Sequence, residues 1–267
     1  MMQDRKFDDL VSWFSGRGKV IVALSGGVDS AVVACAAKKA LDGNAVAITA
    51  DYKTLSDEEL ESARKIAKEI GIRHEVIEYS ELENKDFVKN DDYRCFHCRN
   101  ELAEHLLEVA EKEHARLIVD GTNADDLDDF RPGIMALKQH GVKSPLAELS
   151  ITKNQVRQIA NMLSLSIFDK PSNACLASRI PHGTEVTADK LKRIEEAEIV
   201  VKRLFGVKQV RVRDHGEIAR IEVGKDERKL LFDQVKLDEL DSELRKLGFK
   251  HVAIEASGYK TGSLNVI

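Results

Sequence analysis

Short aliphatic runs alternate with amphipathic stretches through the first half of the chain. Each run is bounded by polar residues or glycine, which predicts a buried strand. The four predicted strands span residues 19–24, 45–50, 74–79 and 116–120. Apolar residues at helical spacing lie between them, and the predicted helices span residues 30–41, 56–70 and 98–114. This alternation is typical of βαβ units, so it predicts an α/β fold built on a mostly parallel sheet.

The order of elements changes in the second half. A short connection at 145–150 and a helix at 152–163 lead to an irregular stretch, 169–183, where Pro171 and Pro181 predict a loop. The elements expected after it are a helix at 188–204, strands at 209–213 and 218–223 joined by a hairpin turn at 214–216, a helix at 225–247 and a strand at 251–256. We therefore expect two domains, a parallel-sheet domain over 1–183 and a small α+β domain over 184–267.

Composition and charge narrow the class of protein. The 267 residues are 43% apolar and 33% charged, as in an ordered globular protein. The formal net charge of -5 gives no overall attraction to nucleic acid, so no nucleic-acid partner is expected. No apolar run approaches the roughly 20 residues that span a bilayer, and the first residues lack the pattern of a signal peptide. We therefore expect a cytoplasmic protein with no membrane partner.

A glycine-rich loop joins the first predicted strand to the first predicted helix. Its sequence is Ser25-Gly26-Gly27-Val28-Asp29-Ser30. Two consecutive glycines let backbone amides approach an anion, and the following helix adds its dipole. The Ser25 and Ser30 hydroxyls can donate to phosphate, whereas Asp29 suits an anion site only when a divalent cation bridges it to the phosphates. The loop thus predicts a phosphate site with Mg²⁺ at Asp29. The alternative is an ordinary glycine-rich turn.

The loop lacks the lysine of a Walker loop and resembles the SGGxDS signature of the PP-loop ATP pyrophosphatases. Members of that superfamily split ATP into AMP and pyrophosphate while they activate a carbonyl. The resemblance implies that residues 121–126, just past the fourth strand, line the nucleotide site, where a solvated acidic turn is the alternative. It implies that ATP contacts Ala23, Ser25, Gly26, Gly27, Val28, Asp29, Ser30, Thr49, Ala50, Gly121, Thr122, Asn123 and Asp125.

Four cysteines in a chain of this size predict metal or thiol chemistry and no disulfide framework. Cys95 and Cys98 have the spacing that lets two thiolates bind one metal or cluster. The thiol of Cys175 lies beside Arg179 in a proline-bounded loop, which predicts a lowered pKa and a role as nucleophile or metal ligand. A buried apolar cysteine is the alternative there. Cys35 lies on the apolar face of a predicted helix and is expected in the core.

The segment Cys-Leu-Ala-Ser-Arg at 175–179 closely resembles the LarE family, the ATP-dependent sulfur transferases that make the nickel-pincer nucleotide cofactor. The resemblance covers essentially the whole chain and includes residues 210–216, 219–223 and 258–265. It implies an anionic small-molecule nucleotide as the substrate. Each arginine among the substrate-binding residues that it implies could, taken alone, be a solvated surface residue. The substrate-binding residues that it implies are Ser178, Arg179, Arg211, Arg213 and Lys260, the last at a place where the family can carry arginine.

The same resemblance implies the reaction. ATP adenylates a carboxylate of pyridinium-3,5-biscarboxylic acid mononucleotide with Mg²⁺ at Asp29 and Glu222, pyrophosphate leaves, and sulfur displaces AMP. The family uses two sulfur sources, the sacrificed sulfur of the cysteine itself, here Cys175, or a 4Fe-4S cluster on three cysteines. Since Cys95 and Cys98 can join Cys175, the cluster is the expected source. A zinc site completed by His97 or His105 and an isolated dithiol are the alternatives, and Glu222 could be an ordinary exposed strand acid.

Three other functions stay open at this point. An ammonia-using ligase of the NAD synthetase type shares the loop and the adenylation step but needs no cysteines. A tRNA thiolase also holds a cluster on three cysteines, although the acidic chain argues against RNA binding. A non-enzymatic sensor would bind adenine nucleotide without turnover. The family forms trimers and hexamers, so a homo-oligomer is expected.

Overall fold

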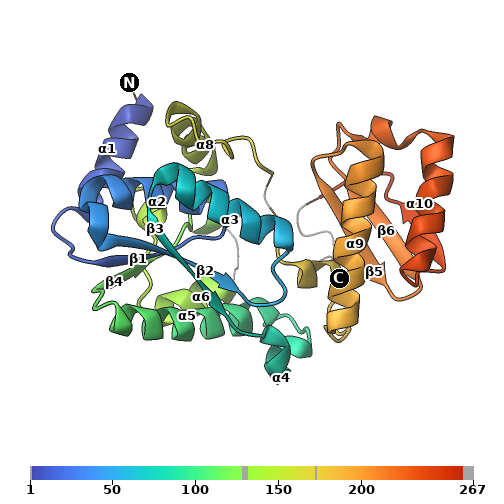
Figure 1. Cartoon of the computed structure of the whole chain (residues 1–267), viewed down its shortest axis with the longest axis horizontal. Helices are drawn as coiled ribbons and strands as arrows, with labels where there is room; N and C mark the ends of the chain where they lie inside the picture. Colours follow the sequence, from blue (N-terminus) through green and yellow to red (C-terminus); the bar gives the residue numbers. More distant parts are fainter. Residues whose placement is uncertain (1, 128–131, 172, 261–267) are drawn as a thin grey trace. The chain divides into compact units, whose positions relative to one another are not determined.

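The computed structural model describes residues 2–127, 132–171 and 173–260. Contacts divide the chain into two compact units, and each is described by itself (Figure 1). The first unit comprises Met1–Glu81 and Tyr93–Asn173. The second comprises Leu82–Asp92 and Ala174–Ile267. The longer part of the second unit starts at Ala174, whereas the predicted boundary is at 184, and the unit also includes Leu82–Asp92 from the first half of the chain.

A parallel four-stranded sheet forms the centre of the first unit, in the order β3-β2-β1-β4. Its strands are β1 (Val20–Ala23), β2 (Ala45–Asp51), β3 (Arg73–Glu78) and β4 (Leu117–Val119). Side chains of β1 enter two different cores, Val20 and Val22 one and Ile21 the other. Apolar residues on both faces are what a sheet covered on both sides requires. The predicted fold class is confirmed.

Helices cover both faces of this sheet (Figure 1). On one face pack α1 (Met2–Phe14), α2 (Val28–Leu41), α3 (Asp57–Ile70) and α8 (Lys153–Met162). On the other pack α5 (Arg94–Lys112) and α6 (Pro132–Gln139). Side-chain caps at Ser56 and Thr152 satisfy the first amides of α3 and α8 and fix where these helices begin. Helix α5 begins at Arg94, four residues before the predicted start, so Cys95 and Cys98 lie inside its first turns.

The second unit contains a three-stranded sheet in the order β5-β6-β7. Strands β5 (Val210–His215) and β6 (Ile218–Val223) form the predicted hairpin, and β7 (His251–Ile254) pairs parallel to β6. Helices α9 (Ala188–Phe205) and α10 (Gln234–Lys246) pack on it. The single helix predicted at 225–247 is wrong. It divides into a 3-10 turn, η5 (Arg228–Leu231), and α10, because the Asp233 side chain accepts from the amide of Lys236 and starts a new helix.

Short helical turns complete the connections. They are η1 (Asp42–Asn44), η2 (Glu81–Glu83), α4 (Lys85–Val88), η3 (Ala124–Leu127), α7 (Pro145–Glu148) and η4 (Leu176–Arg179). The residues at 261–265 of the last predicted motif lie outside the described residues, as does Ser172. Among the described helices, none is both long and apolar enough to cross a membrane.

Asn90 ties the early segment of the second unit to the loop that follows η4. Its side-chain amide donates to the carbonyl oxygens of Pro181 at 2.9 Å and Thr184 at 2.7 Å. Its own carbonyl accepts from the amide of Gly183 at 2.9 Å. Asn90 is fully buried and has a φ of 57°, a left-handed conformation that asparagine tolerates better than most residues.

Asn90→Ala should lower the free energy of unfolding by about 2–3 kcal/mol, because it leaves buried carbonyl groups without a donor. Urea denaturation followed by far-ultraviolet circular dichroism measures this change. Lys89→Ala, at the exposed neighbouring residue, is the control and should stay within about 0.5 kcal/mol of the parent. Equal stabilities of the two variants would contradict a structural role for the Asn90 side chain.

Candidate active site

The glycine-rich loop lies at the carboxyl end of β1, where ligands of open α/β sheets bind. Gly26 has a φ of +75°, and a Cβ atom there would lie 2.7 Å from the Glu59 carbonyl oxygen. Gly27 precedes α2 without a side-chain cap, so the first amides of α2 can receive an anion. Ser25 is exposed and can donate to a ligand, whereas Ser30 is buried. The loop therefore has the geometry of a phosphate site.

Ser30 shapes the loop from inside. Its hydroxyl oxygen accepts from the Ser25 amide at 3.1 Å and lies 3.1 Å from the Ser25 hydroxyl. It also contacts the Gly27 carbonyl at 3.1 Å, to which it can donate its one proton. The structure thus places Ser30 as a brace of the loop, beside its predicted role as a phosphate donor.

Gly121 brings the segment after β4 against the start of α2. A Cβ atom at Gly121 would lie 2.6 Å from the Ser30 amide nitrogen and 2.9 Å from the Ser30 Cα. Only glycine allows two backbones to approach this closely. Asp120 holds the turn from the strand side, since it accepts from the Thr122 amide at 3.1 Å and the Thr122 hydroxyl at 2.7 Å. The close approach delivers the predicted residues 121–126 to the loop.

Asp29 lies at the meeting point of these segments. Its carboxylate accepts from the Asn123 side chain at 3.2 Å and pairs with the Lys153 ammonium group. The Lys153 amide in turn donates to Asp125 at 2.8 Å. A carboxylate oxygen is a suitable ligand for Mg²⁺, so Asp29 fits the predicted ion, whereas Asn123 presents its Nδ2 to Asp29 and its Oδ1 to the Asp125 amide. Lys153 was not predicted, because it is far from the loop in sequence and only folding brings it there.

At the end of β2, where contact with adenine is predicted, the Thr49 side chain forms polar contacts with Leu24 and His74. Thr49 is 1% exposed, and its hydroxyl donates to the Leu24 carbonyl at 2.6 Å. The same oxygen lies 2.8 Å from Nε2 of His74, which therefore carries the proton of this contact. The Thr49 side chain thus joins strands, and contact with a base would fall to backbone groups near Ala50.

Cys95 and Cys98 lie at the start of α5, in the same unit as the phosphate loop. Cys95 is exposed and Cys98 half-buried, and no cysteine of the described residues forms a disulfide. Gly133 of α6 packs against this turn, since a Cβ atom there would lie 3.1 Å from the Cys95 carbonyl oxygen.

Glu81 is a buried acid beside Cys98. It is fully buried and accepts from the Thr54 hydroxyl at 2.5 Å. Burial raises the pKa of Glu81 to about 7, and hydrogen bonds with Cys98 and Thr54 oppose that rise. Its Oε1 atom and the Tyr79 hydroxyl, both buried, have no hydrogen-bond partner among the described residues. Both atoms therefore keep a free capacity to form a hydrogen bond.

The two thiols fit two ligands of a cluster, and Cys175 belongs to the other unit. Within the described residues, no three histidine, cysteine or carboxylate side chains gather closely enough to hold a metal ion. His105 stacks on Tyr79, with ring centroids 4.2 Å apart. Cys35 packs partly buried against the main core, and burial raises its pKa to about 12, as suits an unreactive structural thiol.

Cys175 is half-buried and immediately precedes the turn η4 in the second unit. Arg179 at the end of this turn is fully buried and donates to the Cys175 carbonyl at 2.9 Å. It also forms a two-point ion pair with Glu198 of α9, at 2.8 and 3.1 Å. Glu198 further accepts from the Val212 amide at 3.0 Å. Arg179 therefore holds the turn in place, and the predicted role as a substrate clamp would have to be added to this one.

Arg213 and Glu222 form a second buried pair behind the same turn. Arg213 donates to the Ser178 carbonyl and to Glu222, each at 2.8 Å. Glu222 is fully buried and also lies 3.2 Å from Arg220, so it is not the exposed strand acid considered above. A metal ion at Glu222 would have to replace these two arginine contacts.

Arg211 adds a third cation to this region. It is 5% exposed and lies over the Tyr259 ring, 5.1 Å from its centroid. Burial, and next the positive charge of Arg179, lower the pKa of Arg211 to about 10. An anion bound beside it would offset this cost, which suits the predicted substrate role. Lys260 is exposed.

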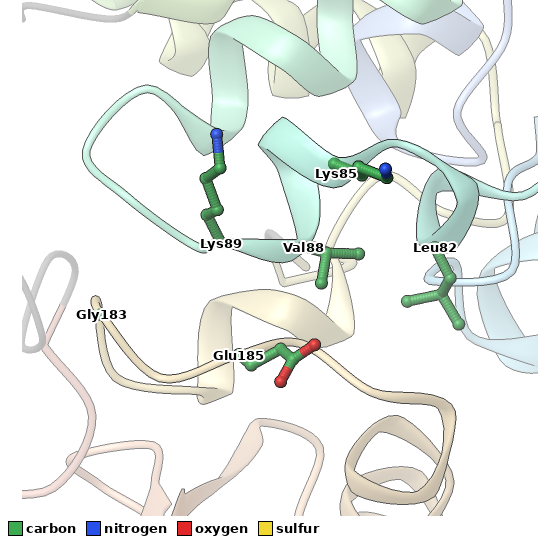
Figure 2. Close-up of a pocket in the computed structure, with 6 residues that line it drawn as sticks. All are labelled: Leu82, Lys85, Val88, Lys89, Gly183 and Glu185. Atoms are coloured by element: carbon green, nitrogen blue, oxygen red, sulfur yellow. The ribbon is translucent and has the colours of Figure 1, made fainter.

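A cavity of about 420 Å³ lies elsewhere in the second unit. Figure 2 shows its lining, in which Val88 and Glu185 face each other while Lys89 extends away from them. None of the predicted site residues belongs to this lining. Its six residues are Leu82, Lys85, Val88, Lys89, Gly183 and Glu185.

Two of the known proteins that resemble this chain match it over nearly its whole length. The NAD synthase family model matches residues 10–116. A pyridinium-3,5-bisthiocarboxylic acid mononucleotide synthase of Lactiplantibacillus plantarum is 31% identical over 96% of this chain and 92% of its own length. An uncharacterised protein of Synechocystis is 43% identical over 99% of this chain and 98% of its own. An ammonia-dependent NAD⁺ synthetase of Chlorobaculum tepidum is 30% identical, over 60% of this chain and 59% of its own.

Gly121→Ala should weaken ATP binding by about tenfold or more, because a methyl group at this position drives the 121–126 segment away from Ser30. Isothermal titration calorimetry with ATP and Mg²⁺ measures the change. Gly43→Ala is the matched control, since a Cβ atom there has no neighbour within 4 Å. Equal affinities would contradict the proposed close contact.

Protonation of His74 should lower the free energy of unfolding as the pH falls. Burial, and next the charge of Arg64, lower its pKa below the usual 6.5 in the folded protein. The unfolded chain therefore binds the proton first, and stability decreases as the pH falls from 6.5 towards the lower folded pKa. Urea denaturation from about pH 7.5 to about pH 5 should show a smaller decrease for His74→Gln than for the parent. Parallel curves would contradict this assignment.

Proposed function

Because the chain belongs to the LarE family of PP-loop ATP-dependent sulfurtransferases, we propose that it transfers sulfur to pyridinium-3,5-biscarboxylic acid mononucleotide. The observation that carries the proposal is the end-to-end similarity to a synthase of the bisthiocarboxylic acid product. The NAD synthetase relative matches only part of the chain. The similarity to the synthase therefore extends through the second unit, which contains Cys175 and the buried arginines. The product would serve the nickel-pincer nucleotide cofactor.

The first step is adenylation of a substrate carboxylate. The amides at the start of α2 and the exposed Ser25 hydroxyl bind the phosphates of ATP. A magnesium ion held by Asp29 would neutralise charge on the phosphates when bound. A carboxylate oxygen attacks the α-phosphorus, the bond to the β-phosphate oxygen breaks, and pyrophosphate leaves. The carbonyl then carries AMP, a good leaving group.

The second step replaces AMP by sulfur. A 4Fe-4S cluster on Cys95, Cys98 and Cys175 would supply a sulfide as the nucleophile, which requires Cys175 to come close to the other two cysteines. In the alternative, the Cys175 thiol loses its proton and attacks the carbonyl, and AMP leaves. A base then removes the Cα proton of Cys175 as the Cβ–Sγ bond breaks, which yields the thiocarboxylate and dehydroalanine. The two thiols in one turn of α5, beside two buried polar atoms without partners, favour the cluster.

The second unit supplies positive charge for an anionic substrate. Arg211 and Arg213 are buried in the same region as Arg179, and Lys260 is exposed. Phosphate and carboxylate groups are the natural partners of guanidinium groups. We infer that Ser178 and these cations bind the substrate, that Glu222 acts there through Arg213 or as a metal ligand, and that the enzyme works in the cytoplasm as a homo-oligomer.

The test is a single reaction mixture of protein purified without oxygen, ATP, Mg²⁺ and the biscarboxylic substrate. The parent should release pyrophosphate and form a thiocarboxylate, detected by mass spectrometry. Cys175→Ala should still release pyrophosphate but form at least about a hundredfold less product, because only the sulfur step needs the thiol.

Cys95→Ser separates the two sulfur routes. It should abolish product and the absorbance of a cluster near 400 nm if three cysteines hold iron, whereas the sacrificial route predicts full activity and loss of one sulfur from Cys175. Lys112→Met, an exposed position at the far end of the same helix, is the control. Ammonia-dependent amide formation without thiocarboxylate would overturn the proposed function.

A further inference from the structure

The phosphate loop rests on the first turns of α3. The Gly26 carbonyl accepts from the Ser62 hydroxyl at 3.1 Å. The Gly26 Cα packs against the Glu59 carbonyl, which leaves no room for a Cβ atom. The position of the loop is therefore set by two residues of α3.

The end of the first unit is tied to the same turns. Lys170 donates to the Gly26 carbonyl at 3.1 Å, the Ser62 hydroxyl at 2.7 Å and the Glu59 carboxylate at 3.0 Å. Asn173 donates to the other Glu59 oxygen at 3.0 Å. The Glu59 side chain is 9% exposed and that of Lys170 18%, so water screens this cluster only weakly. Glu59 thus joins the phosphate loop to Lys170 and Asn173.

Cys175 is two residues beyond Asn173, so chain geometry keeps their Cα atoms within about 7 Å. The last residue of the first unit, from which the chain continues to Cys175, is therefore held by the same carboxylate that supports the loop. We infer that Glu59, Lys170 and Asn173 are positioning residues that anchor, at the phosphate loop, the end of the first unit from which the chain runs to Cys175. This inference rests on the proposed function and goes beyond it.

The anchor matters because an acyl adenylate can react with water or with sulfur. Attack by water breaks the bond to AMP and returns the carboxylate, so ATP is consumed without product. Attack by sulfur breaks the same bond and gives the thiocarboxylate. A misplacement of about 1 Å can cost a reaction about a hundredfold, so a loosened anchor favours water.

Asn173→Asp tests this role without changing the size of the side chain. It places a carboxylate against Glu59 and should break the contact. Pyrophosphate release should stay within about threefold of the parent, while thiocarboxylate formation falls about tenfold or more. The double variant Glu59→Gln with Asn173→Asp restores an amide–carboxylate pair in the opposite direction and should recover most of the product. Glu58→Gln, exposed on the same helix, is the control.

A second measurement does not depend on the reaction. Hydrogen exchange of peptides covering 174–180 should be faster in Asn173→Asp than in the parent and slow again in the double variant. Unchanged coupling and unchanged exchange in Asn173→Asp would overturn the anchor, as would equal loss of both activities in a folded protein or failure of the double variant to recover. If the parent forms no thiocarboxylate, the proposed function fails. Hydrogen exchange alone then shows whether Asn173 and Glu59 hold this part of the chain in place.

Discussion

The close contact between Gly121 and Ser30 is the constraint on which the nucleotide site depends. A separation of 2.6 Å between a Cβ atom at Gly121 and the Ser30 amide excludes every side chain larger than hydrogen. Because β1 and β4 are parallel neighbours, their carboxyl ends deliver the phosphate loop and residues 121–126 to one place. Asn123 reaches Asp29 only through this contact. The arrangement explains why two glycine-containing segments about ninety residues apart form one site.

Local signals predicted most of the fold. The four aliphatic runs became the strands of the parallel sheet, and the capping residues Ser56 and Thr152 mark helix starts as expected. The start of α5 was predicted four residues too late, because Tyr93 precedes the helix without a side-chain cap and gives no sequence signal for its start. Helix α1 was also missed, although Phe7, Leu10 and Phe14 have helical spacing and pack in the main core. The inclusion of 82–92 in the second unit depends on contacts such as those of Asn90, which no local pattern encodes.

The residues of the candidate site also fall into two groups, those that a local sequence pattern predicts and those that only long-range contacts bring to the site. The phosphate loop and the paired cysteines are contiguous, so the sequence identifies them. Lys153, Lys170 and Glu198 act through contacts with residues distant in sequence, and nothing in their neighbourhoods distinguishes them from surface charges. The substrate-binding role of Arg179 stays a prediction, and its burial against Glu198 gives it a structural role that charge alone did not predict. Composition favours an arginine at the surface, and only the carboxylate of α9 makes burial favourable.

The ion pair between Lys153 and Asp29 has a consequence for the order in which ligands arrive. A divalent ion that enters alone must first displace an ammonium group and gains only one carboxylate in return. An ion already attached to a triphosphate brings its own oxygen ligands, and the released lysine then meets new negative charge. For the magnesium ion proposed at Asp29, this ion pair would therefore disfavour a bare ion and favour one that arrives bound to the triphosphate.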